Sequence, residues 1–213
     1  MTKIIGVVQV KGGAGRSTLA TNLAGELSKV GKTVIIDCDM PQGTAASWHS
    51  VRQAQNKGGD LTLETASTHG ELIDIVERHE KAKYIVLDAP PRIAEITRAI
   101  LVMSDLCLLP VGASKAEIWA TGDILELIEE AKKIKPINAK IVWTRHRGFT
   151  NLAKDLTAQV KKELGLPILK TVMTLRVAYQ DALGEGLTGA ETTDTNTRNE
   201  IRLLTDEIKH ALR

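Results

Sequence analysis

The chain has 213 residues, of which 43% are hydrophobic and 25% are charged, and its formal net charge is +2. This length and composition predict a globular protein and exclude a fibrous or disordered one. The small net charge does not by itself identify a polyanion-binding protein, although basic residues gathered on one face would still bind one. Aromatic residues make up only 3% of the chain, which argues against recognition of single strands by stacked aromatic side chains. We expect one domain spanning residues 1–213.

Apolar runs, cysteines and histidines indicate the compartment of the protein and whether it binds zinc. No apolar run approaches the ~20 residues needed to cross a bilayer, and the first apolar run leads into a glycine loop without a small-residue cleavage site. We therefore expect a cytoplasmic protein. Cys38 and Cys107 lie in apolar, strand-like segments, which predicts reduced, buried thiols. The five histidines are scattered, without the spacing of a zinc site.

Short apolar runs alternate with longer segments of helical periodicity along the whole chain. The runs predicted to be strands are residues 4–10, 33–37, 84–89, 106–111, 139–145 and 167–173. The segments between them place apolar residues three or four positions apart, as in Leu19, Leu23 and Leu27. This pattern predicts an α/β fold, a doubly wound and mostly parallel sheet with helices on both faces. Such sheets bind their ligands at the carboxyl ends of the strands.

A glycine-rich loop follows the first predicted strand and opens directly into a helix. Its residues are Lys11, Gly12, Gly13, Ala14, Gly15, Arg16, Ser17 and Thr18. Glycines let backbone N–H groups curl around a phosphate, and the helix N-terminus adds partial positive charge. Ser17 follows the cationic residue, where a hydroxyl binds Mg²⁺, and Thr18 is placed to reach the α-phosphate. The loop therefore predicts a nucleotide site made of these residues.

Acidic residues end two of the predicted strands. Asp37 and Asp39 follow the second strand, and Asp88 ends the third. The carboxyl ends of parallel strands meet at one edge of the sheet, so these side chains are expected beside the glycine loop. A carboxylate there holds Mg²⁺ through water or orients an attacking water in phosphoryl transfer. Each of them alone is also compatible with turn formation or helix capping.

Four segments together resemble the deviant Walker A ATPases of the ParA/MinD class. They are KGGAGRST, VIIDCDMPQG, YIVLDAPP and MTLRVAYQDALGEG, and the resemblance covers nearly the whole chain. The short length and the segment MSDLCLLPVGAS are similar to the small ParA partition proteins of the ParF type. The resemblance implies a P-loop ATPase fold, ATP and Mg²⁺ as cofactors, and an ATP-dependent homodimer in which two subunits face each other across both nucleotides.

The resemblance also assigns roles to individual residues. It implies that Lys11 is the signature lysine, which crosses to the phosphates of the other subunit's ATP. Asp39 matches the residue that positions the attacking water, and Lys11, Asp39 and Arg16 are thus the candidate catalytic residues. Ser17, Asp37 and Asp88 are the candidate metal site, with Asp88 at the Walker B position.

Two positions depart from the family pattern. Arg16 stands where the family has the Walker lysine, and the wide planar guanidinium does not replace a compact ammonium without rearrangement. We expect Arg16 to attract phosphate but to slow hydrolysis or weaken nucleotide binding. Glu117 occupies the loop in which small ParA proteins often carry Asp.

Residues 144–147 are placed to contact the base, with Arg145 the candidate, although a plain basic surface loop is the alternative.

ParA dimers bind double-stranded DNA without sequence preference, so basic residues late in the chain are candidate contacts. They are Lys154, Lys161, Lys162, Lys170, Arg176, Arg198, Arg202, Lys209 and Arg213. A dimer doubles any such patch, and binding should then fall steeply with salt. Each residue taken alone is also compatible with a solvated helix face.

The C-terminal segment separates DNA-binding from membrane-binding members of the class. Its stripe of Ile201, Leu204, Ile208 and Leu212 is amphipathic, but acidic residues accompany it and no aromatic residue does. An interfacial membrane anchor favours a basic polar face and bulky apolar residues. We therefore predict a helix that packs on the core, and no membrane partner.

The first functional hypothesis is a nucleoid-associated ATPase that partitions or positions a plasmid, chromosome or protein cargo, with hydrolysis stimulated by a ParB-like or other cargo adaptor protein. A second is a nucleotide-gated scaffold that binds ATP with little or no hydrolysis because of Arg16. A metabolic P-loop enzyme that transfers phosphate to a small molecule is disfavoured by Lys11 and by the absence of a substrate-binding insertion.

Overall fold

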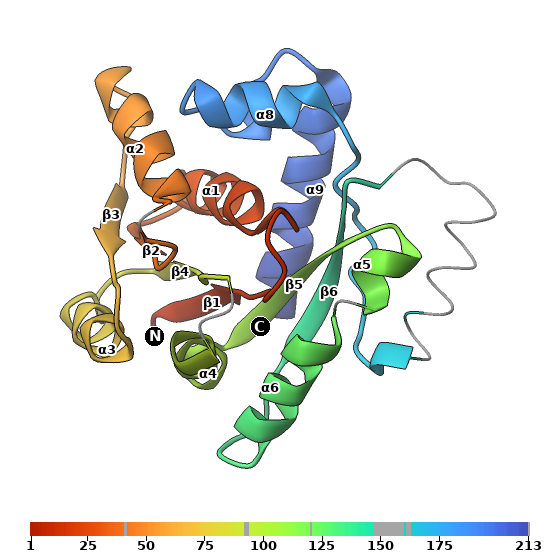
Figure 1. Cartoon of the computed structure of the whole chain (residues 1–213). Helices are drawn as coiled ribbons and strands as arrows, with labels where there is room; N and C mark the ends of the chain where they lie inside the picture. The colour runs from red at the N-terminus through yellow and green to blue at the C-terminus, as the bar shows by residue number, and fades with distance from the viewer. Residues whose placement is uncertain (41, 92–93, 120, 147–159, 161–162, 213) are drawn as a thin grey trace.

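The computed structural model describes residues 1–40, 42–91, 94–119, 121–146, 160 and 163–212. Within these ranges the strands form one sheet in the order β3-β2-β4-β1-β5-β6, and every neighbouring pair is parallel (Figure 1). The strands are β1 (Lys3–Val7), β2 (Thr33–Asp37), β3 (Leu61–Thr65), β4 (Tyr84–Asp88), β5 (Leu106–Gly112) and β6 (Ala139–Thr144). The parallel α/β architecture confirms the predicted fold class.

Helices follow the strands in turn and cover both faces of the sheet (Figure 1). Their bounds are α1 (Arg16–Leu27), α2 (Thr44–Ala54), α3 (His69–Arg78), α4 (Ala94–Met103), α5 (Lys115–Trp119), α6 (Gly122–Lys132), α8 (Val177–Gly184), the 3₁₀ turn η1 (Gly189–Glu191) and α9 (Thr195–Ala211). Because β4 and β5 lie on either side of β1, the chain reverses direction across the sheet at β1. This is the switch point at which α/β sheets form a crevice for ligands.

Two apolar cores lie on opposite faces of the sheet. In β2, Ile35 faces the core with α1, α2, α8 and α9, whereas Val34 and Ile36 face the core with α3, α4, α5 and α6. Strand residues on both faces are therefore buried, which explains the continuous apolar runs in the sequence. The stripe of α9 is buried as predicted, with Ile201, Leu204, Ile208 and Leu212 at 7% exposure or less.

The edge strand β3 was not among the predicted strands. Its sequence, Leu-Thr-Leu-Glu-Thr, alternates apolar and polar residues, and it pairs only with β2. A search for continuous apolar runs finds strands buried on both faces and overlooks one that is half exposed. The α/β prediction was unaffected, because the extra strand extends the sheet at its far edge.

The strand predicted at 167–173 was wrong as a regular strand. The segment runs parallel to β6 with isolated bridges, Ile141 to Ile168 and His146 to Thr174. Between those bridges, Glu207 of α9 accepts hydrogen bonds from the backbone N–H groups of Lys170 and Thr171 at 2.7 and 2.9 Å. The N–H groups are thus bonded to a side chain rather than to a strand, and the ladder is interrupted.

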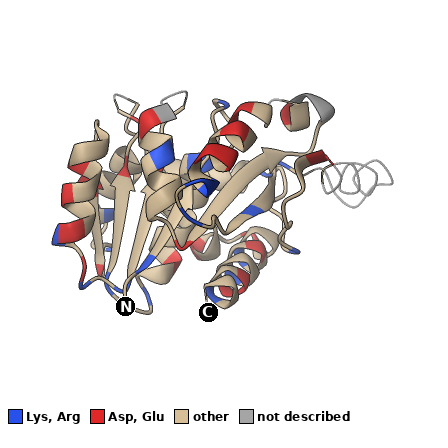
Figure 2. Ribbon diagram, turned by 90° about the horizontal axis from the view of Figure 1, so that it is seen from below, with Lys and Arg blue, Asp and Glu red and all other residues tan. Residues whose placement is uncertain are grey.

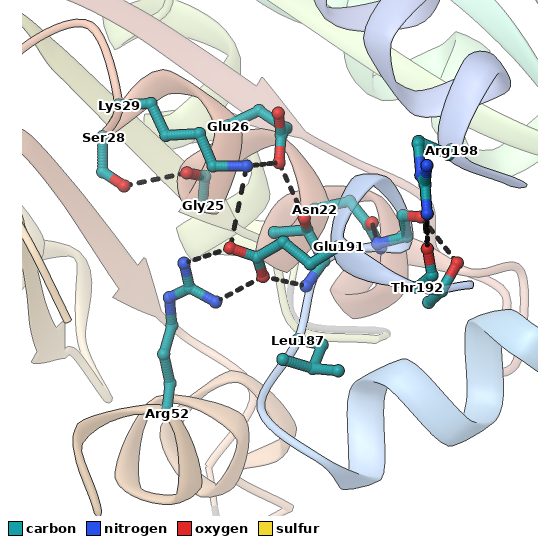
Figure 3. Close-up of polar contacts among 12 residues, drawn as sticks. Asn22, Gly25, Glu26, Ser28, Lys29, Arg52, Leu187, Glu191, Thr192 and Arg198 are labelled. Atoms are coloured by element: carbon teal, nitrogen blue, oxygen red, sulfur yellow. Dashed lines mark hydrogen bonds and ion pairs between the residues drawn. The ribbon is translucent and has the colours of Figure 1, made fainter. Parts of the chain in front are cut away.

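Buried charge ties α2 to the segment that precedes α9 (Figure 3). Arg52, 3% exposed, binds both carboxylate oxygens of Glu191 at 2.8 and 3.0 Å and also donates to the Gly186 carbonyl oxygen. Glu191 in turn accepts from the Thr188 N–H at 2.8 Å and lies 3.6 Å from the Lys29 ammonium. This bidentate pair fixes α2 against η1.

The predictions on membrane spans and cysteines can be compared with the described residues. No helix among them is long and apolar enough to cross a bilayer. Cys38 and Cys107 are both unpaired and buried, as predicted. Burial raises the pKa of the Cys107 thiol to about 12 and raises that of Cys38 further, so neither is a reactive thiolate at neutral pH.

Candidate nucleotide site

The glycine loop joins β1 to α1 at the carboxyl edge of the sheet. Gly13 has φ 73° and Gly15, the N-cap of α1, has φ 93°, both in the left-handed region that favours glycine. No acidic side chain lies in the first turn of α1. The backbone donors and the partial positive charge of this helix end are therefore available to an anion.

Two polar side chains, Gln9 and Thr144, hold the loop in shape. The buried Gln9 accepts from the Val10 N–H at 2.9 Å and the Lys11 N–H at 3.4 Å. The buried Thr144 hydroxyl at the end of β6 donates to the Ala14 carbonyl oxygen at 2.9 Å. Sequence reasoning missed Gln9, and it placed Thr144 in the segment 144–147 expected at the base without predicting its bond to the loop.

Arg16 points back into the protein and is only 6% exposed. Its Nε donates to the Ala89 carbonyl oxygen at 2.9 Å, and its Nη1 donates to the carbonyl oxygens of Lys11, at 2.7 Å, and Gln9. Its Nη2 lies 3.6 Å from Asp39 Oδ2. The charge stays beneath the loop, but most of the donors are occupied by protein acceptors, and only Nη2 is directed toward the site.

Asp88 is a buried carboxylate beside Ser17. It is 1% exposed, and neither carboxylate oxygen has a hydrogen-bond partner in the described part of the chain. Burial raises its pKa to about 7; the Ser17 hydroxyl lowers it and Asp37 raises it further. A buried carboxylate without donors is costly unless a cation or a proton accompanies it. The chemistry of Asp88 and the Ser17 hydroxyl therefore fits Mg²⁺.

No group of three or more His, Cys, Asp or Glu side chains gathers for a metal anywhere in the described ranges. Mg²⁺ does not need such a cage, since it is commonly held by one or two carboxylates together with phosphate oxygens and water. Nucleotide phosphates would supply the remaining ligands of a magnesium ion at Ser17 and Asp88.

Asp37 is fully buried and bonded to the backbone through both carboxylate oxygens. Oδ1 accepts from the Asp39 N–H and Oδ2 from the Ala46 N–H, each at 3.0 Å. Ala46 lies in the first turn of α2, whose N-cap Gly43 has no side chain for this purpose. Burial raises the pKa of Asp37, and these hydrogen bonds partly offset the effect. The carboxylate thus orders the loop that carries Asp39.

Lys11 and Arg145 share one carboxylate. Lys11 Nζ lies 2.7 Å and Arg145 Nη2 2.8 Å from Oε1 of Glu117, a side chain that is 14% exposed on α5. The lack of a side chain at Gly112 leaves room for this cluster, because a Cβ there would lie 2.9 Å from Arg145 Nη2 and 3.0 Å from Glu117. Glu117 therefore joins the start of the glycine loop to the end of β6.

Two adjoining hollows meet at Gly13, Gly15 and Thr18. The first is polar and is also lined by Arg16, Ser17, Asp39, Gln42 and Thr44. The second extends beyond β6 and is also lined by Thr144, Arg145, Met173, Thr174, Leu175, Arg176, Tyr179 and Gln180. The first suits phosphates and the second an apolar-faced base and ribose, so a nucleotide would span both.

The predicted site residues that line these hollows are Gly13, Gly15, Arg16, Ser17, Thr18, Asp39 and Arg145, whereas Lys11, Gly12, Ala14, Asp37 and Asp88 line neither. Gln42, Thr44 and the wall from Met173 to Gln180 were not assigned roles from the sequence. The segment MTLRVAYQDALGEG supported the family resemblance, but its spacing does not show which side chains face a ligand. Of the segment 144–147, Thr144 and Arg145 line the second hollow, and residue 147 lies outside the described residues.

Several basic residues proposed for DNA are engaged in local contacts. Arg176 lies 3.4 Å from Glu200, Lys209 is 2.6 Å from Asp206, and Arg198 donates to the Thr192 carbonyl oxygen. Arg202 is exposed on α9. Lys154, Lys161, Lys162 and Arg213 lie outside the described residues. Figure 2 shows basic and acidic positions interspersed over the ribbon rather than separated onto different faces.

A parallel sheet whose first strand leads through a glycine loop into a helix, with carboxylates at neighbouring strand ends, defines a phosphate-loop nucleotide-binding protein. The model of the CobQ/CobB/MinD/ParA nucleotide binding domain matches residues 5–188, and the chain belongs to this family. The resemblance inferred from the motifs is thereby confirmed.

Named relatives agree with this family, and a solved structure has the same fold. The chain is 26% identical over 189 residues to maintenance of carboxysome distribution protein A of Halothiobacillus neapolitanus, covering 86% of this chain and 84% of that protein. It is 27% identical over 237 residues to the chromosome-partitioning ATPase Soj of Thermus thermophilus, covering 96% and 94%. A putative plasmid partition protein of Borrelia burgdorferi B31, bound to AMPPNP, superposes with a TM-score of 0.75 at 20% identity, covering 99% of each chain.

Proposed function

We propose that this chain is a ParA-like ATPase that uses ATP and Mg²⁺ to form a face-to-face homodimer, binds double-stranded DNA without sequence preference, and so partitions or positions a cargo. The observation that carries the proposal is the glycine loop with the buried carboxylate of Asp88 beside Ser17. The family and the relatives, which act in carboxysome distribution and chromosome partitioning by name, support it. The cargo class is a plasmid, a chromosome or a protein body.

Each loop residue has a role under this proposal. Backbone N–H groups from Gly12 to Thr18 bind the phosphates, and Ser17 and Asp88 hold Mg²⁺, which neutralises phosphate charge. Asp37 sets the position of Asp39 through the Asp39 N–H. Asp39 orients the attacking water, and Lys11 reaches the phosphates of the partner subunit's nucleotide. Arg145 borders the base.

The reaction is the hydrolysis of ATP to ADP and phosphate. A water oxygen bonds to the γ-phosphorus, the bond from that phosphorus to the β,γ-bridging oxygen breaks, and the water proton leaves to solvent or to phosphate. Such chemistry depends on positioning and charge rather than on a covalent group from the protein. A ParB-like or other adaptor bound to the cargo would stimulate this step and release the dimer from nucleoid DNA in the cytoplasm.

The geometry of Arg16 favours a second candidate, a nucleotide-gated scaffold with little or no turnover. The guanidinium donates to three backbone carbonyl oxygens, and only Nη2 is directed toward the site. A guanidinium group held by these bonds does not move with the γ-phosphate as a flexible lysine side chain does. ATP would then drive assembly without a hydrolytic cycle.

The deciding experiment measures oligomeric state by light scattering with no nucleotide, with ADP and with ATP in Mg²⁺, and follows ATP consumption in the same samples. An ATP-dependent dimer with slow turnover supports the positioning ATPase. A stable ATP dimer without turnover supports the scaffold. A monomer in all three conditions contradicts both candidates. A separate DNA-binding measurement tests the first candidate further, because DNA binding that needs no ATP contradicts it.

A further inference from the structure

Glu200 of α9 receives four hydrogen bonds from one short segment of chain. Its Oε2 accepts from the Thr174 N–H at 3.0 Å and from the Tyr179 hydroxyl at 2.7 Å. Its Oε1 accepts from the Thr174 hydroxyl at 2.7 Å and from Arg176 Nε at 3.4 Å. The carboxylate is 16% exposed. One side chain on the last helix thus holds three residues of the 174–179 segment.

These three residues line the second hollow beside the glycine loop, whereas Glu200 does not. Arg176 is the N-cap of α8, and Tyr179 lies in its first turn. The Arg176 side chain makes no cap for α8, because a guanidinium has no acceptor for a backbone N–H, and its Nε donates to Glu200. Glu200 therefore contacts three members of this wall without itself lining the hollow.

The segment has few other means of keeping its shape. It is not a regular strand, and its nearest backbone bonds to the region after β6 are those from the His146 N–H to Met173 and from the Leu175 N–H to His146. Backbone groups outside a ladder need side-chain partners, and hydrogen bonds to an ionised group are the strong ones. Glu200 supplies such a partner at the point where the chain turns into α8.

We propose that Glu200 is a positioning residue for nucleoside binding, which orders Thr174, Arg176 and Tyr179 as the wall that meets the base and ribose. This inference rests on the proposed function, because it assumes that the second hollow receives a nucleoside. It adds that the C-terminal helix determines part of the affinity for nucleotide without touching it. Substituting Glu200 should weaken the nucleoside contacts and leave the phosphate contacts intact.

The chain contains a matched control on the same helix. Glu207 lies two turns further along α9 and accepts from the N–H groups of Lys170 and Thr171. It holds the same irregular segment, but neither of those residues lines the hollow. A loss of helix-to-segment bonding in general should therefore appear in both Glu200→Gln and Glu207→Gln, and a loss of nucleoside positioning only in the first.

The test uses the full chain and compares wild type, Glu200→Gln and Glu207→Gln. Dissociation constants are measured in Mg²⁺ for ATP and for inorganic tripolyphosphate, which has the phosphates but no nucleoside, and each variant's melting temperature is recorded without ligand. We expect Glu200→Gln to raise the Kd of ATP about tenfold, since a charge-assisted bond is replaced by weaker ones. Tripolyphosphate binding should change less than about twofold, well below that effect.

The possible results separate the inference from the function it rests on. Wild-type protein that binds no ATP would overturn both. Wild type that binds ATP, with Glu200→Gln equal to Glu207→Gln in ATP affinity, overturns the positioning role alone. Equal weakening of ATP and tripolyphosphate in Glu200→Gln also overturns it, because that pattern reports a general structural effect. Selective weakening of ATP supports it, and where tripolyphosphate binds wild type too weakly to measure, the comparison with Glu207→Gln decides.

Discussion

The ammonium of Lys11 lies 2.7 Å from Oε1 of Glu117, within the same subunit. Under the proposed function this lysine must reach a nucleotide on the other subunit, so the ion pair opposes the motion that the dimer needs. Arg145 binds the same oxygen at 2.8 Å, which leaves Glu117 neutralised when Lys11 departs. The contact thus keeps the lysine available but inactive in a lone subunit.

Glu117→Gln should promote ATP-dependent dimerisation. Removing one partner of a partly exposed ion pair changes the free energy by up to about 1 kcal/mol; because a homodimer has two such pairs, the dimerisation constant changes by up to roughly thirtyfold. We expect the concentration for half-dimerisation in ATP, measured by light scattering, to fall by about that factor. Glu130→Gln, which breaks the exposed pair with Arg98, serves as the control and should leave it unchanged. Unchanged or weaker dimerisation of Glu117→Gln contradicts the inhibitory role of the contact.

Arg16→Lys should raise ATP turnover. Two nitrogens of Arg16 donate to the three carbonyl oxygens, and a lysine has only one nitrogen and a flexible stem, so we expect it to follow the γ-phosphate instead. We expect turnover to increase on the order of tenfold or more, as placing one donor on developing charge does in other enzymes. Phosphate release is the measurement, with the exposed Arg78→Lys as the control. Equal turnover in both variants would sink the hypothesis that Arg16 limits hydrolysis.

Glu191→Gln should destabilise the fold, and the effect should shrink in acid. Burial would raise the pKa of Glu191, but the hydrogen bonds from Arg52 and the Thr188 N–H outweigh it and lower the pKa to about 2. Because the pKa is lowered from 4.5, the ionised Glu191 carboxylate contributes to the free energy of unfolding above pH 4.5, and this contribution is lost as the pH falls toward 2. It amounts to about 3 kcal/mol at pH 7 and to roughly 1 kcal/mol at pH 3.

Urea unfolding of wild type and Glu191→Gln at pH 7 and pH 3 measures this difference directly. Glu126→Gln, an exposed position on α6, is the control and should cost little at either pH. A stability loss in Glu191→Gln that is the same at both pH values would show that the buried pair with Arg52 does not depend on the charge of the carboxylate.

Arg202→Glu should weaken DNA binding and reduce its salt dependence. Arg202 is exposed on α9, unlike the neighbouring basic residues that are engaged in local contacts. Each phosphate contact contributes a slope of about −0.9 to the logarithmic salt dependence, so a dimer that loses two contacts should lose about 2 from that slope. Titration of duplex DNA with ATP present, over a range of salt, measures it. Lys57→Glu, exposed beyond α2, is the charge-matched control, and equal losses in both would contradict a role specific to Arg202.

Much of the fold and of the phosphate-binding part of the site could be predicted from the sequence, because these features depend on residues close together in the chain. Gly13 and Gly15 mark the loop since their φ values require glycine, and Asp88 is conspicuous because a charge ends an apolar strand. The nucleoside wall could not be predicted. Thr174 and Tyr179 both hydrogen-bond to Glu200 of the distant α9, and no periodicity in the sequence reports that contact.

The sequence by itself determined the parallel α/β sheet, the glycine loop and the acidic strand ends, since hydrophobic period and glycine placement act locally. Tertiary structure decided how individual charges were used. Arg16 donates to backbone carbonyl oxygens, and Lys11 pairs with Glu117. Glu207 accepts from the backbone N–H groups of Lys170 and Thr171, which a regular strand at 167–173 would have bonded to its neighbour. These outcomes depend on which donors and acceptors become neighbours once distant elements pack, and a buried polar group takes the partner that packing supplies.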